Sequence, residues 1–251
     1  MASVDDIFSV WAPQQVSDVE LRVTVHSEIA EKRPEMLPVI CGAVVNNLMH
    51  ESLQRLDEKD RFPLLVSFLA RSKAARAGDL GEVMVTEYVI KYSDHPIYIR
   101  RLRYKDINNL AMRGDDALAF RLNARGRTEV LKVESKARNR LSKTVLDEAI
   151  MGLARNKGRP TPHSIAFVVA RLREHGRDAE AEVVQQVLGN TIPLGRVRHL
   201  VFTTSGNHPE KLLRNAATAI DKVVTCDFVG LHVPDYPTLI KTVFETLHGA
   251  E

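Results

Sequence analysis

Glu134 and Lys136 stand two positions apart in the segment VLKVESK, residues 130–136. Residues two positions apart in a β-strand point to the same face, so these side chains are expected to project together, away from Val133. The carboxylate suits a magnesium ion, and the lysine suits water activation and charge stabilisation when a phosphodiester is cleaved. An E-x-K triplet alone is a weak signal, because about one arises by chance in a chain of this size.

A second carboxylate precedes this pair. The segment GDDALAF places Asp115 and Asp116 at the start of an apolar run, and Glu134 follows Asp116 by 18 positions. The intervening NARGR has the asparagine and glycine of a hairpin turn, so the two strands are expected to be antiparallel neighbours with Asp116 beside Glu134. Two carboxylates and a carbonyl oxygen such as that of Ser135 suit Mg²⁺, with Mn²⁺ as a substitute, because this cation keeps several waters and phosphate oxygens.

Glu82 lies in the first turn of an expected helix and is the candidate that completes the metal site. Each candidate also has a plain structural explanation. Glu82 suits any helix start, Asp116 suits a turn before a strand, and Glu134 with Lys136 suits an ion pair on an exposed sheet. Their joint order on the expected helix and strands favours a nuclease site over these separate explanations.

The elements that must position these residues predict an α/β protein with a mixed sheet flanked by helices. Expected strands are Glu20–Val25, Pro96–Tyr104, Asp115–Leu122, Thr128–Lys136, His199–Thr204 and Val223–Val229. Expected helices are Met36–Leu53, Arg61–Arg71, Leu80–Tyr92 after a break at Gly78, 143–155 capped by Ser142, 162–175 capped by Thr161, Ala179–Leu188, Pro209–Ala219 and Tyr236–His248. We expect residues 1–75 to form an N-terminal section, a candidate partner-binding surface, and residues 76–251 to form the domain that carries the site.

From about Gly78 to Ala154 the chain resembles the PD-(D/E)xK nuclease superfamily. That superfamily has a restriction-endonuclease-like core: a helix with an acidic residue, three strands carrying D and then E-x-K, a helix, and a further strand. The resemblance implies metal-dependent phosphodiester hydrolysis. By this resemblance the catalytic residues are Glu82, Asp116, Glu134 and Lys136, and the metal ligands are Glu82, Asp116, Glu134 and the backbone carbonyl of Ser135.

Two details qualify this resemblance. Asp116 is preferred over Asp115, because the superfamily aspartate directly precedes the hydrophobic stretch. Many superfamily members also carry a glutamine on the helix after E-x-K, but residues 143–155 contain none, and Asp147 and Glu148 occupy that helix instead. The role of that helix position is therefore open.

A closer resemblance covers more of the chain. The G-x-D-x-x-A-F and E-x-K-A motifs, the front section and a helical insertion before the last strands are similar to the HamA family, the nuclease subunits of Hachiman antiphage defence systems. The resemblance implies DNA as the substrate. It also implies a partner helicase, HamB, that uses ATP and releases the nuclease when aberrant DNA is sensed.

The formal net charge of +3 is too small to require a polyanionic partner. Basic residues concentrate, however, in 100–105, 121–127 and 132–143. These stretches fit either a solvated surface or a phosphate-binding face around the acidic site. The candidates for nucleic-acid contact are Lys132, Arg138, Arg140 and Lys143.

Other classes of protein receive little support. No segment has the apolar length of a membrane helix, and Asp5 and Asp6 argue against a secretory signal. Cys41 and Cys226 are expected to be buried and unpaired, which fits the cytoplasm. The histidines lack metal-ligand spacing, and a phosphate loop is missing, so any use of ATP must come from a partner.

Three alternatives remain at this stage. The chain is either a nuclease effector, a catalytically silent DNA-binding or assembly subunit of a helicase complex, or a stand-alone restriction-type nuclease. Nothing in the sequence separates DNA from RNA as the substrate, because the candidate site contacts the scissile phosphate and not the base.

Overall fold

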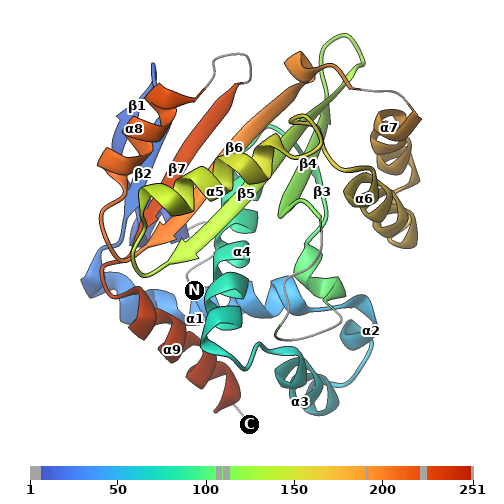
Figure 1. The fold of residues 1–251 in the computed structure, drawn as a ribbon. Coiled ribbons are helices and arrows are strands. Elements are labelled where there is room, and N and C mark those ends of the chain that lie inside the picture. Colours follow the sequence, from blue (N-terminus) through green and yellow to red (C-terminus); the bar gives the residue numbers. More distant parts are fainter. Residues whose placement is uncertain (1–6, 106–108, 110–113, 190–191, 221–224, 250–251) are drawn as a thin grey trace.

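The structure is a computed structural model, and it describes residues 7–105, 109, 114–189, 192–220 and 225–249. A seven-stranded mixed sheet with the order β1-β2-β7-β6-β5-β4-β3 runs through its centre (Figure 1). Strands β2, β7, β6 and β5 are parallel, and β1, β4 and β3 pair antiparallel at the two edges. The strands are β1 (Gln14–Asp18), β2 (Val23–Ser27), β3 (Ile97–Tyr98), β4 (Ala117–Leu122), β5 (Thr128–Arg138), β6 (Val197–Ser205) and β7 (Cys226–His232).

Helices cover both faces of this sheet, which confirms the expected α/β class. One core joins α1, α4 and α9 to the apolar side chains of β5, β6 and β7, and another joins α5 and α8 to β2, β6 and β7. A third core packs α6 and α7, an inserted helical pair, against β3 and β4. The α-helices are α1 (Arg33–Leu48), α2 (Glu51–Gln54), α3 (Glu58–Phe68), α4 (Lys73–Tyr92), α5 (Lys143–Ala154), α6 (Pro162–Glu174), α7 (Asp178–Gly189), α8 (Glu210–Ala219) and α9 (Tyr236–His248).

Capping chemistry explains where several helices begin. Ser142 and Thr161 accept hydrogen bonds from backbone amides three residues on, as predicted for the starts of α5 and α6. The predicted break at Gly78 is wrong, because Ser72 caps the helix instead and α4 continues through that glycine. A glycine inside a helix costs only about 1 kcal/mol, which the packing of α4 offsets.

Other boundaries also differ from the prediction, and the helix expected over Arg61–Arg71 is α3, which begins and ends three residues earlier. The helix expected over Met36–Leu53 is divided into α1 and α2, and the strand expected at Glu20–Val25 begins at Val23, with β1 before it. The strand expected over Pro96–Tyr104 has only two residues, because a 3-10 helix (Arg101–Tyr104) follows it. Residues 223 and 224 of the expected strand Val223–Val229 lie outside the described residues.

The N-terminal section shares the sheet and the main core with the rest of the chain. Strand β2 pairs with β7, and α1 packs in the same core as α4 and α9. The boundary predicted at residue 75 falls inside α4. The role of residues 1–75 as a partner-binding surface stays a prediction.

The described part of the chain also agrees with two exclusions made from the sequence. None of its helices is long and apolar enough to cross a membrane. Cys41 and Cys226 are both buried and free of any disulfide. Burial raises the pKa of the Cys41 thiol to about 11, so this side chain behaves as a small apolar group.

Lys132 ties β5 to the end of α5. Its ammonium is 1% exposed and donates hydrogen bonds to the carbonyl oxygens of Leu153, Arg155 and Arg159, each at 3.0 Å. The same nitrogen lies 3.3 Å from Oδ1 of Asp115. The expected contact between Lys132 and nucleic acid is therefore corrected, because the ammonium is enclosed and fully engaged inside the protein. We call this arrangement the Lys132 clasp.

Replacing Lys132 with Met should lower the free energy of unfolding by about 3–5 kcal/mol, since the buried carboxylate of Asp115 then loses its cation. Urea denaturation at neutral pH measures the change. The matched control is Lys241→Met, because Lys241 is 70% exposed and lies 3.9 Å from Glu245, a pair expected to contribute about 0.5 kcal/mol or less. Equal losses in the two variants would contradict the clasp.

Candidate active site

The hairpin of β4 and β5 places Asp116 beside Glu134. Its turn is built on Asn123, whose side chain accepts hydrogen bonds from the amides of Arg125 and Arg127, and on Gly126 at a φ of +65°. This turn sets the register in which Ala117 faces Val133, so the residue before β4 lies opposite Glu134. The amide of Ser135 donates a hydrogen bond of 2.8 Å to Oδ2 of Asp116.

Glu134 and Lys136 project from the same face of β5, as the alternation predicted. The Lys136 ammonium donates a hydrogen bond of 2.7 Å to Oε1 of Glu134, and the two side chains are 18% and 8% exposed respectively. Burial and the nearby carboxylate of Asp116 raise the pKa of Glu134, although Lys136 opposes this shift. The site therefore holds more negative charge than the lysine alone balances.

Gly152 of α5 makes room for the Glu134 carboxylate. A Cβ built on this glycine would lie 2.5 Å from Cδ of Glu134 and 2.6 Å from both of its oxygens. Glycine is therefore required at this position, in the middle of a helix where it costs about 1 kcal/mol. Gly152 was not among the predicted site residues, although an unexplained glycine in M-G-L, within an otherwise good helix, is a signal that could have indicated it.

Glu82 approaches from the other side of β5. Helix α4 crosses the strand closely at Gly81, where a Cβ would lie 2.6 Å from that of Ala137. Ala137 and Ser135 point toward α4, whereas Glu134 and Lys136 point toward α5, because successive residues of a strand alternate in direction. The structure thus brings Asp116, Glu134 and Lys136 together and places Glu82 next to Asp116 on the opposite face.

The Glu82 carboxyl is buried in an environment that disfavours its charged form. Its Oε1 atom is buried and has no hydrogen-bond partner among the described residues. Burial raises the pKa of Glu82 to about 7, with Asp116 and Asp79 adding to the rise and Arg101 and Lys105 opposing it. A buried carboxyl oxygen without a partner has the character of a group that awaits a cation or a proton.

The donor set fits a magnesium ion through Asp116 and Glu134. The two negative carboxylates repel each other, and a divalent cation between them would remove this repulsion. Mg²⁺ needs only one or two protein carboxylates. The carbonyl of Ser135 points the same way as its amide, toward Asp116, because both groups of a strand residue face one neighbour. In the described part of the chain no three His, Cys, Asp or Glu residues form a ready-made metal cluster, which agrees with the separate position of Glu82.

The structure distinguishes the two adjacent aspartates. Asp115 is 5% exposed, and its Oδ2 accepts hydrogen bonds from the amide and hydroxyl of Thr161 at 2.8 and 3.2 Å. With Lys132 on its other oxygen, Asp115 is fully used in holding the start of α6. Only Asp116 therefore directs its carboxylate to Glu134, in line with the preference given to it above.

Arg101 is a further positioning residue that sequence reasoning missed. It is 8% exposed, and its Nη1 donates a hydrogen bond of 2.6 Å to the backbone carbonyl of Asp116. Its charge also lowers the pKa of Glu82. No sequence feature distinguishes Arg101 from its neighbours, because it stands in a basic stretch that suits surface or phosphate contact as a whole.

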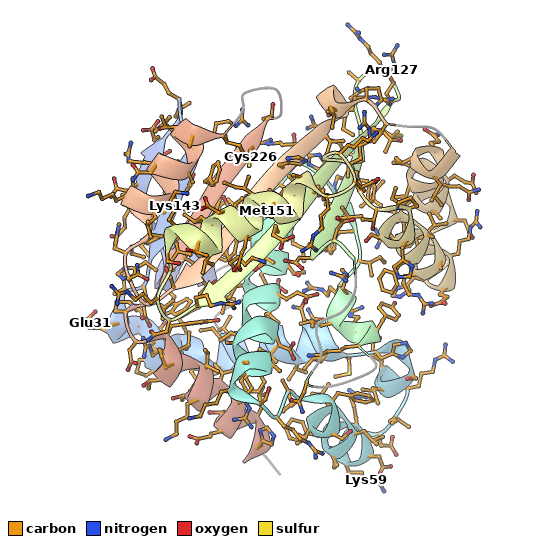
Figure 2. The ribbon with its side chains drawn as sticks, in the orientation of Figure 1. Glu31, Lys59, Arg127, Lys143, Met151 and Cys226 are labelled. Carbon is orange, nitrogen blue, oxygen red and sulfur yellow. The ribbon has the colours of Figure 1, made fainter. Side chains whose placement is uncertain are left out.

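The basic stretches do not converge on the site as a group. Arg100, Arg101 and Lys105 engage Glu87, the Asp116 carbonyl and Asp79. Residues 121–127 lie at the hairpin tip, where Figure 2 shows Arg127 pointing away from the body. Eight strand residues at about 3.3 Å each separate that tip from Lys136, roughly 26 Å.

Three of the four candidates for nucleic-acid contact are exposed near the site. Arg138, Arg140 and Lys143 follow Lys136 at the end of β5 and the start of α5, and the Lys143 side chain is 82% exposed (Figure 2). Lys143 pairs with Asp147 at 2.6 Å. Contact between these three residues and nucleic acid stays a prediction. Only Lys132, the fourth candidate, is excluded, because it is buried.

The helix position that carries glutamine in many superfamily members has no glutamine here. Asp147 pairs with Lys143 at 2.6 Å, and Glu148 is exposed. Glu148 lies one helical turn before Gly152, the residue of α5 that meets Glu134, so the role of this helix position stays open.

The pKa of Glu82 predicts how the stability of metal-free protein depends on pH. Below about pH 4.5 the carboxyl is protonated in both states, and as the pH rises toward 7 the unfolded state releases its proton first. The wild type should therefore lose about 2 kcal/mol of unfolding free energy between pH 5 and 8 relative to Glu82→Gln. Urea titrations with chelator measure this, with Glu148→Gln as the exposed control, and parallel curves for wild type and Glu82→Gln would refute the burial of Glu82.

A pair of glycine substitutions tests the contact between α5 and β5. Gly152→Ala should lower the unfolding free energy by about 1–3 kcal/mol, because its methyl group collides with Glu134. Gly78→Ala in α4 meets nothing within 4 Å and should raise it by about 0.5–1 kcal/mol. Chemical denaturation of both variants gives the comparison, and a gain of stability in Gly152→Ala would contradict the close approach.

The comparisons with known proteins cover both the core and the candidate residues. The HamA family model matches residues 26–247, a span that contains Glu82, Asp116, Glu134 and Lys136. Hachiman protein HamA of Bacillus cereus is 27% identical over 177 residues, which are 70% of this chain and 62% of that protein. The match therefore spans less than two thirds of that relative's length. Because the family model extends over most of the chain, the chain belongs to the HamA family.

Proposed function

We propose that this chain is a metal-dependent nuclease that hydrolyses DNA as the effector of a Hachiman-type antiphage defence system. The observation that carries the proposal is the group of Asp116, Glu134 and Lys136 at the end of the β4–β5 hairpin. Two partly buried carboxylates can bind a metal ion, and the neighbouring lysine can stabilise the negative charge that develops during phosphodiester cleavage. The defence role follows from membership of the HamA family and from the similarity to a Hachiman protein.

Each candidate residue has a separate role in the proposed cleavage. Asp116 and Glu134 would hold the cation together with the Ser135 carbonyl, and a bound Mg²⁺ would supply Lewis-acid stabilisation of the phosphate. The Lys136 ammonium, fixed by Glu134, orients the attacking water and stabilises the negative charge that grows on the phosphate oxygens. Glu82 lies on the opposite side of Asp116, where its negative charge increases the electrostatic attraction between the site and a cation.

The partner in this proposal is a helicase subunit that uses ATP. The similarity to a Hachiman protein supports it, and so does the absence from the sequence of a phosphate loop with which the chain itself would bind ATP. The helicase would hold the nuclease until aberrant DNA releases it. Such a system acts in the cytoplasm, where phage DNA is accessible.

Cleavage of supercoiled and linear DNA in Mg²⁺ tests the nuclease. Lys136→Met should reduce the rate by about 10²–10⁴-fold, because it removes the group that orients water and stabilises charge. Glu134→Gln should reduce the rate as strongly and weaken Mn²⁺ binding in a calorimetric titration. Lys241→Met, an exposed change on α9, is the control and should cleave like the wild type.

Each mixture should be run alone and with any helicase that is encoded beside this chain, plus ATP. Activity that appears only with helicase and ATP would support controlled release by the partner. Cleavage that survives in Lys136→Met and Glu134→Gln would contradict the assignment of the site. DNA binding without cleavage in every mixture would instead identify a catalytically silent assembly subunit.

A further inference from the structure

A concave site lies on the α4 side of the sheet. It has a cavity of about 330 Å³ beneath the β1–β2 hairpin, and its floor is made of apolar side chains from β5, β6 and β7. Two tyrosines of α4 and two arginines form its walls, and we call it the tyrosine pocket: Tyr88, Tyr92, Arg22 and Arg198. None of Asp116, Glu134 or Lys136 lines it.

One wall of the tyrosine pocket is aromatic. Tyr88 and Tyr92 stand one helical turn apart, with ring centroids 4.9 Å apart and planes tilted by 33°. Tyr88 is backed by Phe202 at 5.3 Å, whereas Tyr92 is 45% exposed. A fixed and partly exposed aromatic ring at a cavity is a surface on which another planar ring can stack.

Another wall of the pocket contains two arginines, Arg22 and Arg198, that form ion pairs with the same carboxylate, that of Asp227. Nε of Arg22 lies 2.8 Å from Oδ1 of Asp227, and Nε of Arg198 lies 2.5 Å from Oδ2. The trio therefore keeps a net charge of +1. The arginine side chains are 41% and 43% exposed, and their hydrogen bonds to described residues use Nε alone. Their terminal nitrogens remain for an anion such as a phosphate, which two arginines bind well.

The backbone at Arg22 supports a role for its side chain. This residue has a φ of +56°, in the left-handed region that favours glycine, and its carbonyl accepts a hydrogen bond from the amide of Phe228. Glycine would make the same turn and the same backbone bond without strain. The arginine at this position instead supplies a guanidinium that pairs with Asp227 and lines the pocket.

Nearby charges do not cancel the positive wall. Asp18 on the rim is paired with Arg214, and burial lowers the pKa of His95 to about 4, so that histidine is neutral at pH 7. Burial raises the pKa of Tyr88 to about 12, so its ring stays an uncharged phenol. The cavity thus combines a neutral aromatic wall, an apolar floor and one excess positive charge.

We propose that the tyrosine pocket binds a mononucleotide, with its base against Tyr92 and its phosphate on Arg22 and Arg198. The cavity volume is at the lower end of the range for small-molecule sites and is too small for a DNA duplex. The site goes beyond the proposed nuclease function. It shares α4 with Glu82 and β5 with Glu134, so a bound nucleotide would contact the elements that hold the catalytic groups.

Calorimetric titration of the full chain with AMP and with GMP tests this site. Arg22→Gly removes the guanidinium and relieves the left-handed strain, so it should weaken AMP binding by about 10-fold or more without loss of thermal stability. Tyr92→Leu should weaken it by about 10-fold through lost stacking. Glu134→Gln should bind AMP like the wild type, which separates this pocket from the catalytic site.

Adenosine and inorganic phosphate, titrated alone, show which half of the nucleotide is recognised. Both should bind at least 10-fold more weakly than AMP. Failure of the wild type to bind either nucleotide below about 1 mM would overturn the proposal, as would phosphate binding as tightly as AMP. Binding that is lost in Glu134→Gln but kept in Arg22→Gly would assign the nucleotide to the catalytic site instead.

Discussion

The register of the β4–β5 hairpin is the constraint on which the site depends. It places the Asp116 carboxylate against the Ser135 amide and beside Glu134, so that two like charges share a partly buried space. A shift by one residue would turn Glu134 and Lys136 to the face of α4 and separate them from Gly152. The hairpin turn at Asn123 and Gly126 therefore determines the chemistry from the far end of both strands.

The rest of the fold compensates for this electrostatic cost. The Lys132 clasp joins β5, the end of α5 and Asp115, and so holds the strand and the residue that flank the candidate catalytic carboxylates. Arg101 fixes the backbone of Asp116 from the other side. These groups are saturated and buried, whereas Glu82 and Glu134 keep raised pKa values. The contacts that stabilise the fold thus surround the site, whereas the two glutamates within it remain electrostatically unfavourable in their charged form.

Local rules were enough to predict part of this arrangement. The period of two placed Glu134 and Lys136 on one face, and the turn residues placed Asp116 beside them. Contacts between distant segments were not predictable: the approach of Gly152 to Glu134, the pairing of β2 with β7, and the hydrogen bond of Arg101. Lys132 looked like its basic neighbours, because a sequence shows charge but not burial, and only the folded α5 and its following loop enclose it.

The four candidate residues are divided between two faces of one strand, and Asp116 connects them. Its charge raises the pKa of both Glu82 and Glu134. Asp116 lies just before β4 begins, where the sheet ends and a group can reach both sides. A cation held there would lower the electrostatic cost of keeping both glutamates charged, because Asp116 raises the pKa of both. Asp116 is therefore the residue through which a metal ion would couple the helix α4 to the E-x-K strand.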